Sequence, residues 1–384
     1  MKFIYAIVLL LLTGMPAYAD HVLGGELLYT HIAGDNYKIT LTLYGDCSGG
    51  TFSHLLNAEP RVTITNELNA FSTVILYEET AKRKEVSNVC PADEANTKCK
   101  NPAGTVPGVT RFVYSAVTQL TPASNWRLAF TAQMDHTGKL QTGFSNAISN
   151  MTNNTGFGFY LMLEAMLNNL HSHNSSPQYT TIPTPFYCIN RAQQYNPGAT
   201  DADGDELAFK LTRPFDVNGI VTTYVSPYTP AYPFSAVAGS FNYNQASGQM
   251  SFVPNKQEVA LIVHNTEEYR NGALVGSSMR AMTFFMQGNC NNEAPYGHID
   301  PSSVSGGILD GNTINVCLPA HTVFFKIPVA DKNLDDINVA LSNIPPGANA
   351  TVQANNTKAP VIDFKWELTN ATGKPYTFFA GYND

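Results

Sequence analysis

The chain has 384 residues, with 22 Lys or Arg against 30 Asp or Glu, so its formal net charge at pH 7 is −8. The few basic residues are scattered, which argues against a nucleic-acid-binding surface because such surfaces need clustered cations. A chain of this length exceeds what one hydrophobic core usually serves, and it predicts two or three domains.

The N-terminal segment predicts export. Lys2 precedes an apolar run from Ile4 to Leu12, and the small residues "AYA" stand directly before Asp20. A basic start, a short apolar core and small residues at the cut define a secretory signal peptide, here residues 1–19. The apolar run is too short to cross a bilayer. We therefore expect a secreted or outer-surface protein without a membrane span, whose six cysteines form disulfides.

Alternation of apolar and polar residues with a period of two predicts β-strands. The segments "YKITLTLY", "WRLAF" and "ELAFKL" each place their apolar residues on one face. The segment "FYLMLEAMLNNL" at 159–170 could be a helix, but its apolar residues also alternate, which favours a strand. Asn, Thr, Ser, Gly, Pro and aromatic residues are abundant, and this composition favours an all-β fold.

A weak internal repeat divides the chain. "NSSP" (174–177) and "NEAP" (292–295) each precede a cysteine and then an aspartate-rich segment, "ATDADGDELAF" in the first copy and "VADKNLDDINVAL" in the second. Two tandem copies of one β-sandwich would produce this order. We therefore predict tandem immunoglobulin-like β-sandwich domains at residues 20–173, 174–290 and 291–384, the last one truncated at its C-terminal end.

Several motifs in order carry a family resemblance. "HVLGGELLYT" with "NYKITLTLYGDC", then "DADGDELAFKL", "EEYRNGALVG" and "FKWELTNATGKPYTF" together resemble the N-terminal region of secreted Bacteroidetes surface proteins. Those proteins carry PKD-like and cadherin-like immunoglobulin-type domains and are often labelled gliding-motility-associated. The resemblance covers most of the chain and implies adhesion or structural spacing, with a cell-surface or extracellular protein or glycan as partner. The chain departs from the family at 134–150, where a cysteine is expected and none is present.

The strand path of a β-sandwich predicts one disulfide. Cys188 begins a strand that ends near Asp201, about one sandwich length away at ~3.3 Å per residue. Cys290 follows the last strand of the same domain and reaches the same end. Bridged Cα atoms must lie within ~7 Å of each other, so we predict a bridge between Cys188 and Cys290.

The remaining cysteines are assigned by proximity along the chain. Cys90 and Cys99 bracket a short loop and form the second predicted pair, which leaves Cys47 single. Cys317 would find its partner beyond Asp384, as in a longer protein.

The "ATDADGDELAF" segment concentrates four carboxyl groups. It is not an EF-hand, because that loop needs glycine at its sixth position and Gly204 is fourth. The cadherin-like resemblance implies that Asp201 and Asp203 bind calcium. Asp205 and Glu268 are added because the "EEYRNG" hairpin should lie at the same end of the sandwich. The alternative is a solvated turn in which Asp side chains cap backbone amides, and the sequence leaves both open.

Catalytic motifs are missing from the sequence. "GDCSGG" resembles a serine-protease loop only superficially, and no nucleophile elbow, zinc-binding helix or phosphate loop occurs. His171 and His173 share a face but are too few for a metal site. Tyr224, Tyr228 and Tyr232 could stack on sugars or pack a Pro-rich loop. We therefore predict a non-catalytic protein, the alternative being a carbohydrate-binding module of a larger secreted protein or enzyme.

Overall fold

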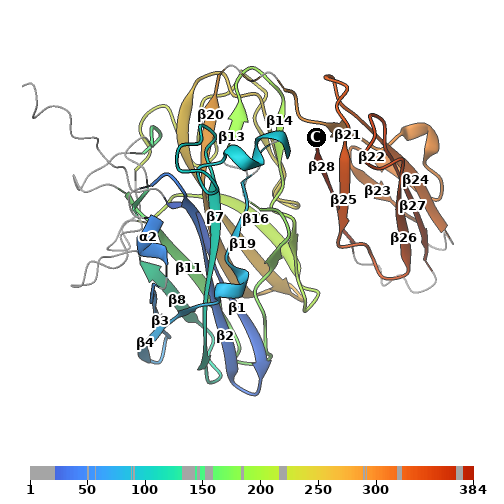
Figure 1. Cartoon of the computed structure of the whole chain (residues 1–384). Coiled ribbons are helices and arrows are strands. Elements are labelled where there is room, and N and C mark those ends of the chain that lie inside the picture. Colours follow the sequence, from blue (N-terminus) through green and yellow to red (C-terminus); the bar gives the residue numbers. More distant parts are fainter. Residues whose placement is uncertain are drawn as a thin grey trace, which may run out of the picture.

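The structure is a computed structural model that describes residues 22–49, 52–56, 58–87, 89, 91–131, 143–144, 148–151, 159–182, 186–215, 223–288, 290, 292–317, 322–368 and 375–384. The expected signal peptide (1–19) and Cys90 lie outside the described residues. The regular secondary structure of the described chain is almost entirely β-strand (Figure 1), which confirms the all-β fold class. Its helical elements are short: α2 (Phe52–Leu55), η1 (Thr80–Lys82), η2 (Pro91–Asn96) and η3 (Pro301–Ser303).

The largest sheet has 13 strands, and its main path runs β4-β3-β8-β11-β20-β1-β2-β7-β5. Strand β6 pairs with β7, β13 and β19 pair with β20, and β16 pairs with β19. The strands of this sheet are β1 (Val22–Ala33), β2 (Asn36–Asp46), β3 (Arg61–Thr65), β4 (Phe71–Ile75), β5 (Tyr77–Glu78), β6 (Lys84–Glu85), β7 (Val109–Gln119), β8 (Trp126–Thr131), β11 (Met162–Leu167), β13 (Phe186–Cys188), β16 (Glu206–Thr212), β19 (Glu258–Arg270) and β20 (Ala273–Gln287).

Three small sheets accompany the large one. They pair β9 with β10, β12 with β15, and β18 with both β14 and β17. Their strands are β9 (Gly143–Phe144), β10 (Phe159–Tyr160), β12 (Gln178–Tyr179), β14 (Gln193–Tyr195), β15 (Ala199–Thr200), β17 (Asn242–Tyr243) and β18 (Met250–Phe252).

The alternating apolar residues that predicted the strands lie on the buried face of each strand. In β2, Ile39, Leu41 and Leu43 are fully buried, whereas Lys38 and Thr40, which alternate with them, are only partly covered. The segment at 159–170 forms strands β10 and β11, which confirms the strand interpretation over the helix. Its alternating residues Leu163 and Leu167 are fully buried.

The long hairpin β19–β20 lies at the centre of the fold. Its strands pair from Glu258 and Met286 down to a two-residue turn. The turn residues, Asn271 and Gly272, both have positive φ (54° and 78°), the requirement of a type I′ hairpin turn. The other edge of β20 is shared by three strands in succession: β11, β1 and, in parallel, β13.

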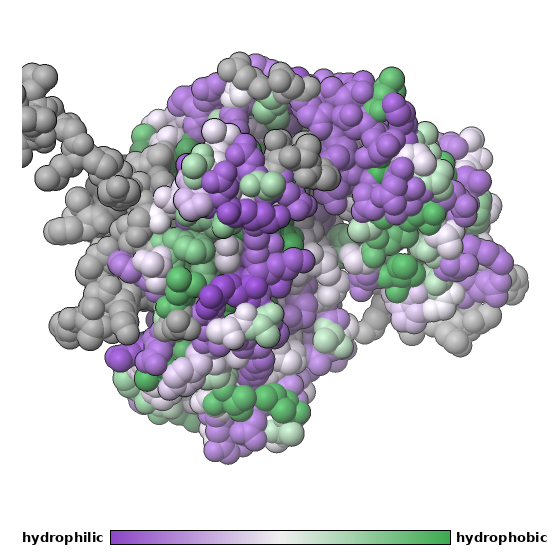
Figure 2. Space-filling model, viewed as in Figure 1, coloured by the Kyte–Doolittle hydropathy of each residue, from purple (hydrophilic) through white to green (hydrophobic). Residues whose placement is uncertain are grey.

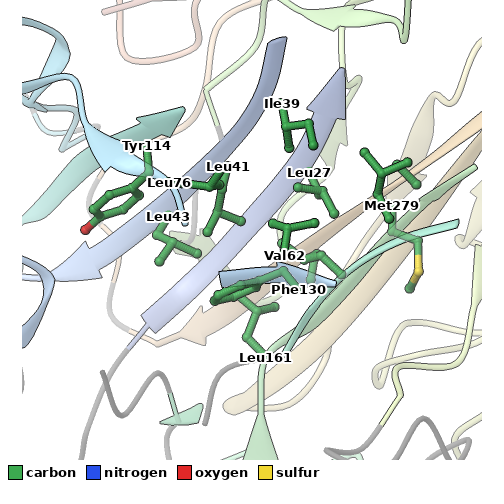
Figure 3. Close-up of a cluster of buried hydrophobic side chains, with 14 of the residues drawn as sticks. Leu27, Ile39, Leu41, Leu43, Val62, Leu76, Tyr114, Phe130, Leu161 and Met279 are labelled. Atoms are coloured by element: carbon green, nitrogen blue, oxygen red, sulfur yellow. The ribbon is translucent and has the colours of Figure 1, made fainter. Parts of the chain in front are cut away.

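Both faces of this hairpin are covered, which explains its nearly continuous apolar sequence. Leu261 and Val263 of β19 enter the first hydrophobic core, which fills the space between the β1-β2-β7 and β3-β8-β11 layers (Figure 3). Ile262 of β19 and Phe284 of β20 point the other way into a second, aromatic-rich core. The hairpin is therefore a shared wall between two cores.

Residues beyond 290 form a separate body, coloured orange to red in Figure 1. A four-stranded sheet of order β21-β24-β27-β26 and the pair β25–β28 enclose a third core, with the hairpin β22–β23 alongside. Its strands are β21 (Tyr296–Gly297), β22 (Ile308–Asp310), β23 (Thr313–Asn315), β24 (Thr322–Ala330), β25 (Asn338–Ser342), β26 (Ala348–Gln353), β27 (Val361–Glu367) and β28 (Phe379–Asn383). We call residues 292–384 the C-terminal unit and the described residues before it the main body.

Only one of the two expected domain boundaries coincides with a break between sheets. The strands after residue 290 pair among themselves within the described chain. The boundary expected after residue 173 crosses a continuous sheet instead, because β1 and β11 hydrogen-bond directly to β20. The surface of both bodies is mainly hydrophilic on the face seen in Figure 2, with smaller hydrophobic patches.

Candidate functional site

The aspartate-rich loop and the end of the β19–β20 hairpin meet, as the sequence predicted. Strand β16 starts directly after the loop and pairs with β19, which sets Leu207 opposite Glu268. One ligand oxygen each of Asp201, Asp205 and Glu268 lies within 4.8 Å of the other two. We call these three residues the first carboxylate cluster.

The loop itself is a capped turn. Asp201 Oδ1 accepts the backbone N–H groups of Asp203 (3.0 Å) and Asp205 (2.8 Å). Gly204 has φ 76°, a left-handed conformation that glycine adopts without steric cost. Asp203 turns away from the cluster, and its Oδ2 accepts the backbone N–H of Ser175 (2.7 Å). The structure thus brings together three of the four predicted metal ligands and gives Asp203 a different partner.

Glu268 is the most deeply buried member of the first cluster, with none of its surface exposed. Burial raises the pKa of Glu268 to about 9, and the charges of Asp201 and Asp205 act in the same direction. Asn174 Nδ2 donates to Glu268 Oε1 (3.1 Å) and opposes this shift. Glu268 is therefore protonated at neutral pH, and its proton removes one negative charge from the cluster.

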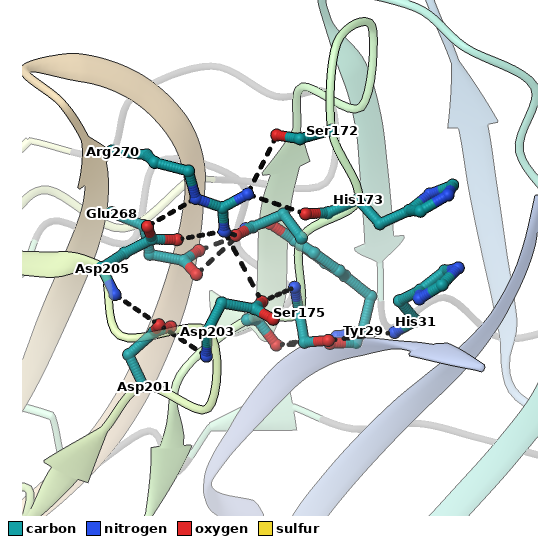
Figure 4. Close-up of polar contacts among 12 residues, drawn as sticks. Tyr29, His31, Ser172, His173, Ser175, Asp201, Asp203, Asp205, Glu268 and Arg270 are labelled. Atoms are coloured by element: carbon teal, nitrogen blue, oxygen red, sulfur yellow. Dashed lines mark hydrogen bonds and ion pairs between the residues drawn. The ribbon is translucent and has the colours of Figure 1, made fainter. Parts of the chain in front are cut away.

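Arg270 is the cation among these carboxylates (Figure 4). Its Nε and Nη2 donate to the two oxygens of Asp205 at 2.7 and 2.6 Å, a bidentate pair. The same guanidinium reaches Asn174 Oδ1, Ser172 Oγ and the carbonyl of His173, each at 2.9 Å. This role of Arg270 was not predicted from the sequence, although alternation along "EEYR" places Glu268 and Arg270 on one side of a strand.

The C-terminal unit holds a second carboxylate cluster, formed by Asp331, Asp335 and Asp384, whose ligand oxygens also lie within 4.8 Å of one another. Its loop repeats the capped turn of the first, because Asp331 Oδ1 accepts the N–H groups of Asn333 (2.6 Å) and Asp335 (3.4 Å). The loop was noted in the sequence as the counterpart of the first; Asp384 was not.

The contacts around the two clusters also match. Asn174 Nδ2 donates to Glu268, and Asn292 Nδ2 donates to Asp384 Oδ2 (2.5 Å). The residue after each asparagine donates its backbone N–H to the loop: Ser175 to Asp203, and Glu293 to Asn333 Oδ1 (2.8 Å). The sequence repeat therefore corresponds to a repeated arrangement of side chains.

Two disulfides are formed within the described residues. Cys188 and Cys290 are bridged, with Cα atoms 5.9 Å apart, which confirms the predicted pair. The predicted strand from Cys188 to Asp201 is wrong: Cys188 ends β13, and the parallel pairing of β13 with the end of β20 brings Cys188 to Cys290. Cys99 is bridged to Cys47 (Cα distance 4.9 Å), so the predicted pairing of Cys99 with Cys90 is wrong. The reason is strand pairing: β2 and β7 are neighbours, and Cys47 N–H binds the carbonyl of Gly108 (3.0 Å) beside Cys99. Cys317 is exposed and free.

The tyrosines proposed for sugar stacking do not form an exposed row. Tyr224 is only partly exposed and packs against the first core. Tyr228 donates its hydroxyl to Glu258 Oε2 (2.5 Å). Tyr232 alone is largely exposed (62%), and its ring lies 5.8 Å from that of Phe241.

His173, one of the two histidines considered as metal ligands, stacks on His31, with ring centroids 3.9 Å apart.

A buried ion pair in the centre of the fold was not foreseen. Arg280 of β20 is fully buried and its Nε lies 3.1 Å from Glu26 Oε2. Its guanidinium also donates to the carbonyl of Thr181 (2.6 Å) and lies over the ring of Tyr179 at 4.8 Å. A lone arginine in the apolar run "MRAMTFFM" was the available signal, because buried charges are kept only with partners.

No protein-family model matches the chain, and no curated protein matches it at a significant level. No helix within the described ranges is long and apolar enough to cross a membrane. The assignment of a function therefore rests on the fold and on the two carboxylate clusters.

Proposed function

We propose that this chain is a non-catalytic, exported cell-surface protein that acts in adhesion or as a structural spacer, of the type expected from the resemblance to Bacteroidetes surface proteins. Its units would be immunoglobulin-like sandwiches related to PKD and cadherin domains. Disulfides and calcium would set their rigidity. Its partner would be an extracellular or surface protein or a glycan.

The repeated arrangement around the two carboxylate clusters is the observation that carries this proposal. An asparagine, the N–H that follows it, and a capped aspartate loop are joined in the same way twice. Repetition of one structural unit along a chain is characteristic of extended modular proteins. A spacer uses such repetition to gain length.

The junction between the two bodies supports a mechanical role. The Cys188–Cys290 disulfide ties the end of the main body to strand β13. Just beyond it, Arg191 Nη1 forms an ion pair with Glu293 Oε1 at 2.5 Å, and Arg191 Nη2 donates to the carbonyl of Cys290 at 3.0 Å. These contacts restrict rotation at the point where the chain passes between the bodies.

The calcium component of the proposal concerns the first cluster, where the predicted ligands Asp201, Asp205 and Glu268 converge. Carboxylate oxygens are the ligands that Ca²⁺ prefers. Arg270 occupies part of the same space, so Ca²⁺ would have to compete with the guanidinium for Asp205.

The proposal is tested with the full chain expressed with its leader in a bacterial host that exports it. We expect the oxidised protein to be accessible to protease on intact cells and to bind an immobilised extracellular protein or a glycan array without hydrolysing either. Efficient cleavage of a polysaccharide or peptide panel by the purified chain would overturn it, as would retention of the protein in the cytoplasm with reduced cysteines.

A further inference from the structure

A cleft opens on the main body where β13 lies beside the end of β20 (Figure 1). Its volume is about 200 Å³. Pockets for drug-sized ligands measure about 300–1,000 Å³, so this cleft has room for a single ring rather than for an extended molecule. Among the described residues that line it, none belongs to either carboxylate cluster.

The floor of the cleft is aromatic. Phe186 of β13 and Phe285 of β20 are partners across the parallel strands, and their rings stack with centroids 5.4 Å apart and planes inclined by 28°. Both rings pack against a small buried core formed by Leu23, Tyr44 and Val109. Both phenylalanines are nevertheless only partly buried, so they offer exposed apolar surface in fixed positions.

The rim of the cleft is polar and carries both donors and acceptors of hydrogen bonds. It consists of Asp46, Ser48, Lys98, Thr105 and Gln287. Ser48, Thr105 and Gln287 are exposed, whereas Asp46 and Lys98 are partly exposed. Carboxylate, hydroxyl, ammonium and amide groups therefore surround one apolar floor.

The Cys47–Cys99 disulfide joins two segments of this rim. Cys47 lies between Asp46 and Ser48, and Cys99 directly follows Lys98. The hydroxyl of Ser48 donates to Asp46 Oδ1 (2.6 Å), which orients both side chains. The bridge thus holds three rim residues from separate parts of the chain in one place.

The Cys188–Cys290 disulfide acts in the same way on the other residues of the cleft. Cys188 lies two residues after Phe186 in β13, and it pairs with Gln287 of β20. Groups that are fixed before a ligand arrives lose less conformational entropy on binding. Both disulfides of the described chain therefore preorganise the same cleft.

We propose that this cleft binds one pyranose ring of a glycan. The aromatic floor takes the C–H face of the sugar, because the face of an aromatic ring carries negative potential and attracts polarised C–H groups. The rim binds the sugar hydroxyls, which both donate and accept hydrogen bonds. An apolar side chain of a partner protein fits less well, because it would cover the rim groups without replacing their hydrogen bonds to water.

This inference rests on the proposed function for its biological purpose, and it deepens that function by naming a glycan as the partner. The test uses the full oxidised chain on a glycan array and in saturation-transfer NMR. The NMR probes are the methyl pyranosides of glucose, galactose, mannose and N-acetylglucosamine. A methyl hexoside has about 13 non-hydrogen atoms, and the affinity per atom of drug-sized ligands gives it a Kd on the order of 10⁻³ M. We expect at least one of these sugars to bind with such a Kd.

Two variants locate the binding. Gln287→Ala removes an exposed rim amide, and Phe285→Leu keeps apolar volume but removes a ring face. Each should raise Kd about two- to tenfold, the effect of losing one hydrogen bond or one aromatic contact, and the double variant should lose most of the saturation transfer. The matched controls, Gln194→Ala in β14 and Phe71→Leu in β4, change exposed residues outside the cleft and should leave Kd unchanged.

The outcomes separate this inference from the proposed function. No binding on the array or to any probe would overturn the inference and leave a protein partner. Sugar binding with the same Kd in the parent and in both cleft variants would overturn the cleft assignment and keep a glycan partner. Tighter binding of N-acetylphenylalaninamide than of every sugar, weakened by the same variants, would overturn the sugar in favour of a protein side chain. Hydrolysis of a bound glycan would instead overturn the proposed function. If Phe285→Leu does not fold, Gln287→Ala decides the test, because its side chain is exposed.

Discussion

Replacing Arg270 with methionine tests whether this side chain is the internal cation of the first cluster. Arg270 forms a bidentate pair with Asp205, whose side chain is 2% exposed, while that of Arg270 is 25% exposed. Breaking a buried pair by removing one partner costs about 3–5 kcal/mol. Because Arg270 is partly hydrated, we expect the lower part of this range, about 3 kcal/mol, as the loss in the free energy of unfolding of the main body.

Tryptophan fluorescence makes this measurement specific to the main body. The chain has two tryptophans, Trp126 in β8 and Trp366 in β27. In a Trp366→Phe background, urea unfolding followed at Trp126 reports on the main body alone. Arg270→Met should lower the transition midpoint, and adding Asp205→Asn should restore much of the loss, because the uncompensated buried charge is then gone.

The variant should also make the first cluster sensitive to calcium. Without the guanidinium, the carboxylates of Asp201 and Asp205 lack a cation, as those of the second cluster do. Ca²⁺ should then recover part of the lost stability of Arg270→Met and have a smaller effect on the parent. A loss below about 0.5 kcal/mol, the range of ordinary surface substitutions, or equal calcium responses in both proteins would refute the role given to Arg270.

Three further results are expected. Folding raises the pKa of Glu268 from 4.5 to about 9, so the contribution of Glu268 to stability is fully present below pH 4.5 and is lost as pH rises to about 9. Glu268→Gln should therefore stabilise the main body by about 3 kcal/mol at neutral pH without metal. If the difference in unfolding free energy between Glu268→Gln and the parent does not change with pH, this prediction is contradicted. Cys90→Ser should leave the Cys47–Cys99 peptide intact in mass-spectrometric mapping, whereas its disappearance would contradict the pairing. Phe284→Ala should cost about 3–5 kcal/mol through the cavity it leaves, and a change in urea midpoint no larger than that of an exposed control such as Phe71→Ala would show that the second core is not packed as described.

Much of the local structure could be predicted because it depends on periodicity and turn chemistry. Alternating residues identified β2, β8 and β16, and the Asn271–Gly272 turn fixed the tip of the central hairpin. Once β16 was expected to begin after the aspartate loop, its pairing with β19 brought Glu268 to that loop. The Cys188–Cys290 bridge was predicted correctly as well, but through a strand that the structure does not contain, since Cys188 ends β13 and reaches Cys290 by parallel pairing with β20.

The features that were missed depend on which strand edges pair. Period-two alternation shows which face of a strand is buried, but it does not show which neighbour each edge binds. Strand β20 is 15 residues long and offers one edge to β11, β1 and β13 in turn, so strands from both sides of residue 173 join one sheet. Edge pairing of β2 with β7 likewise places Cys47, rather than Cys90, beside Cys99.

The two clusters show how one local arrangement can lead to two electrostatic solutions. In each, an asparagine and a capped aspartate turn bring three carboxyl groups within 4.8 Å, and this spacing is unfavourable for three unscreened charges. In the main body Arg270 and the proton on Glu268 remove the repulsion, so the fold does not require a bound ion there. In the C-terminal unit no Lys or Arg among the described residues pairs with the cluster, and burial together with the charges of Asp331 and Asp335 raises the pKa of Asp384, so protonation of Asp384 is the means of compensation that the structure shows there.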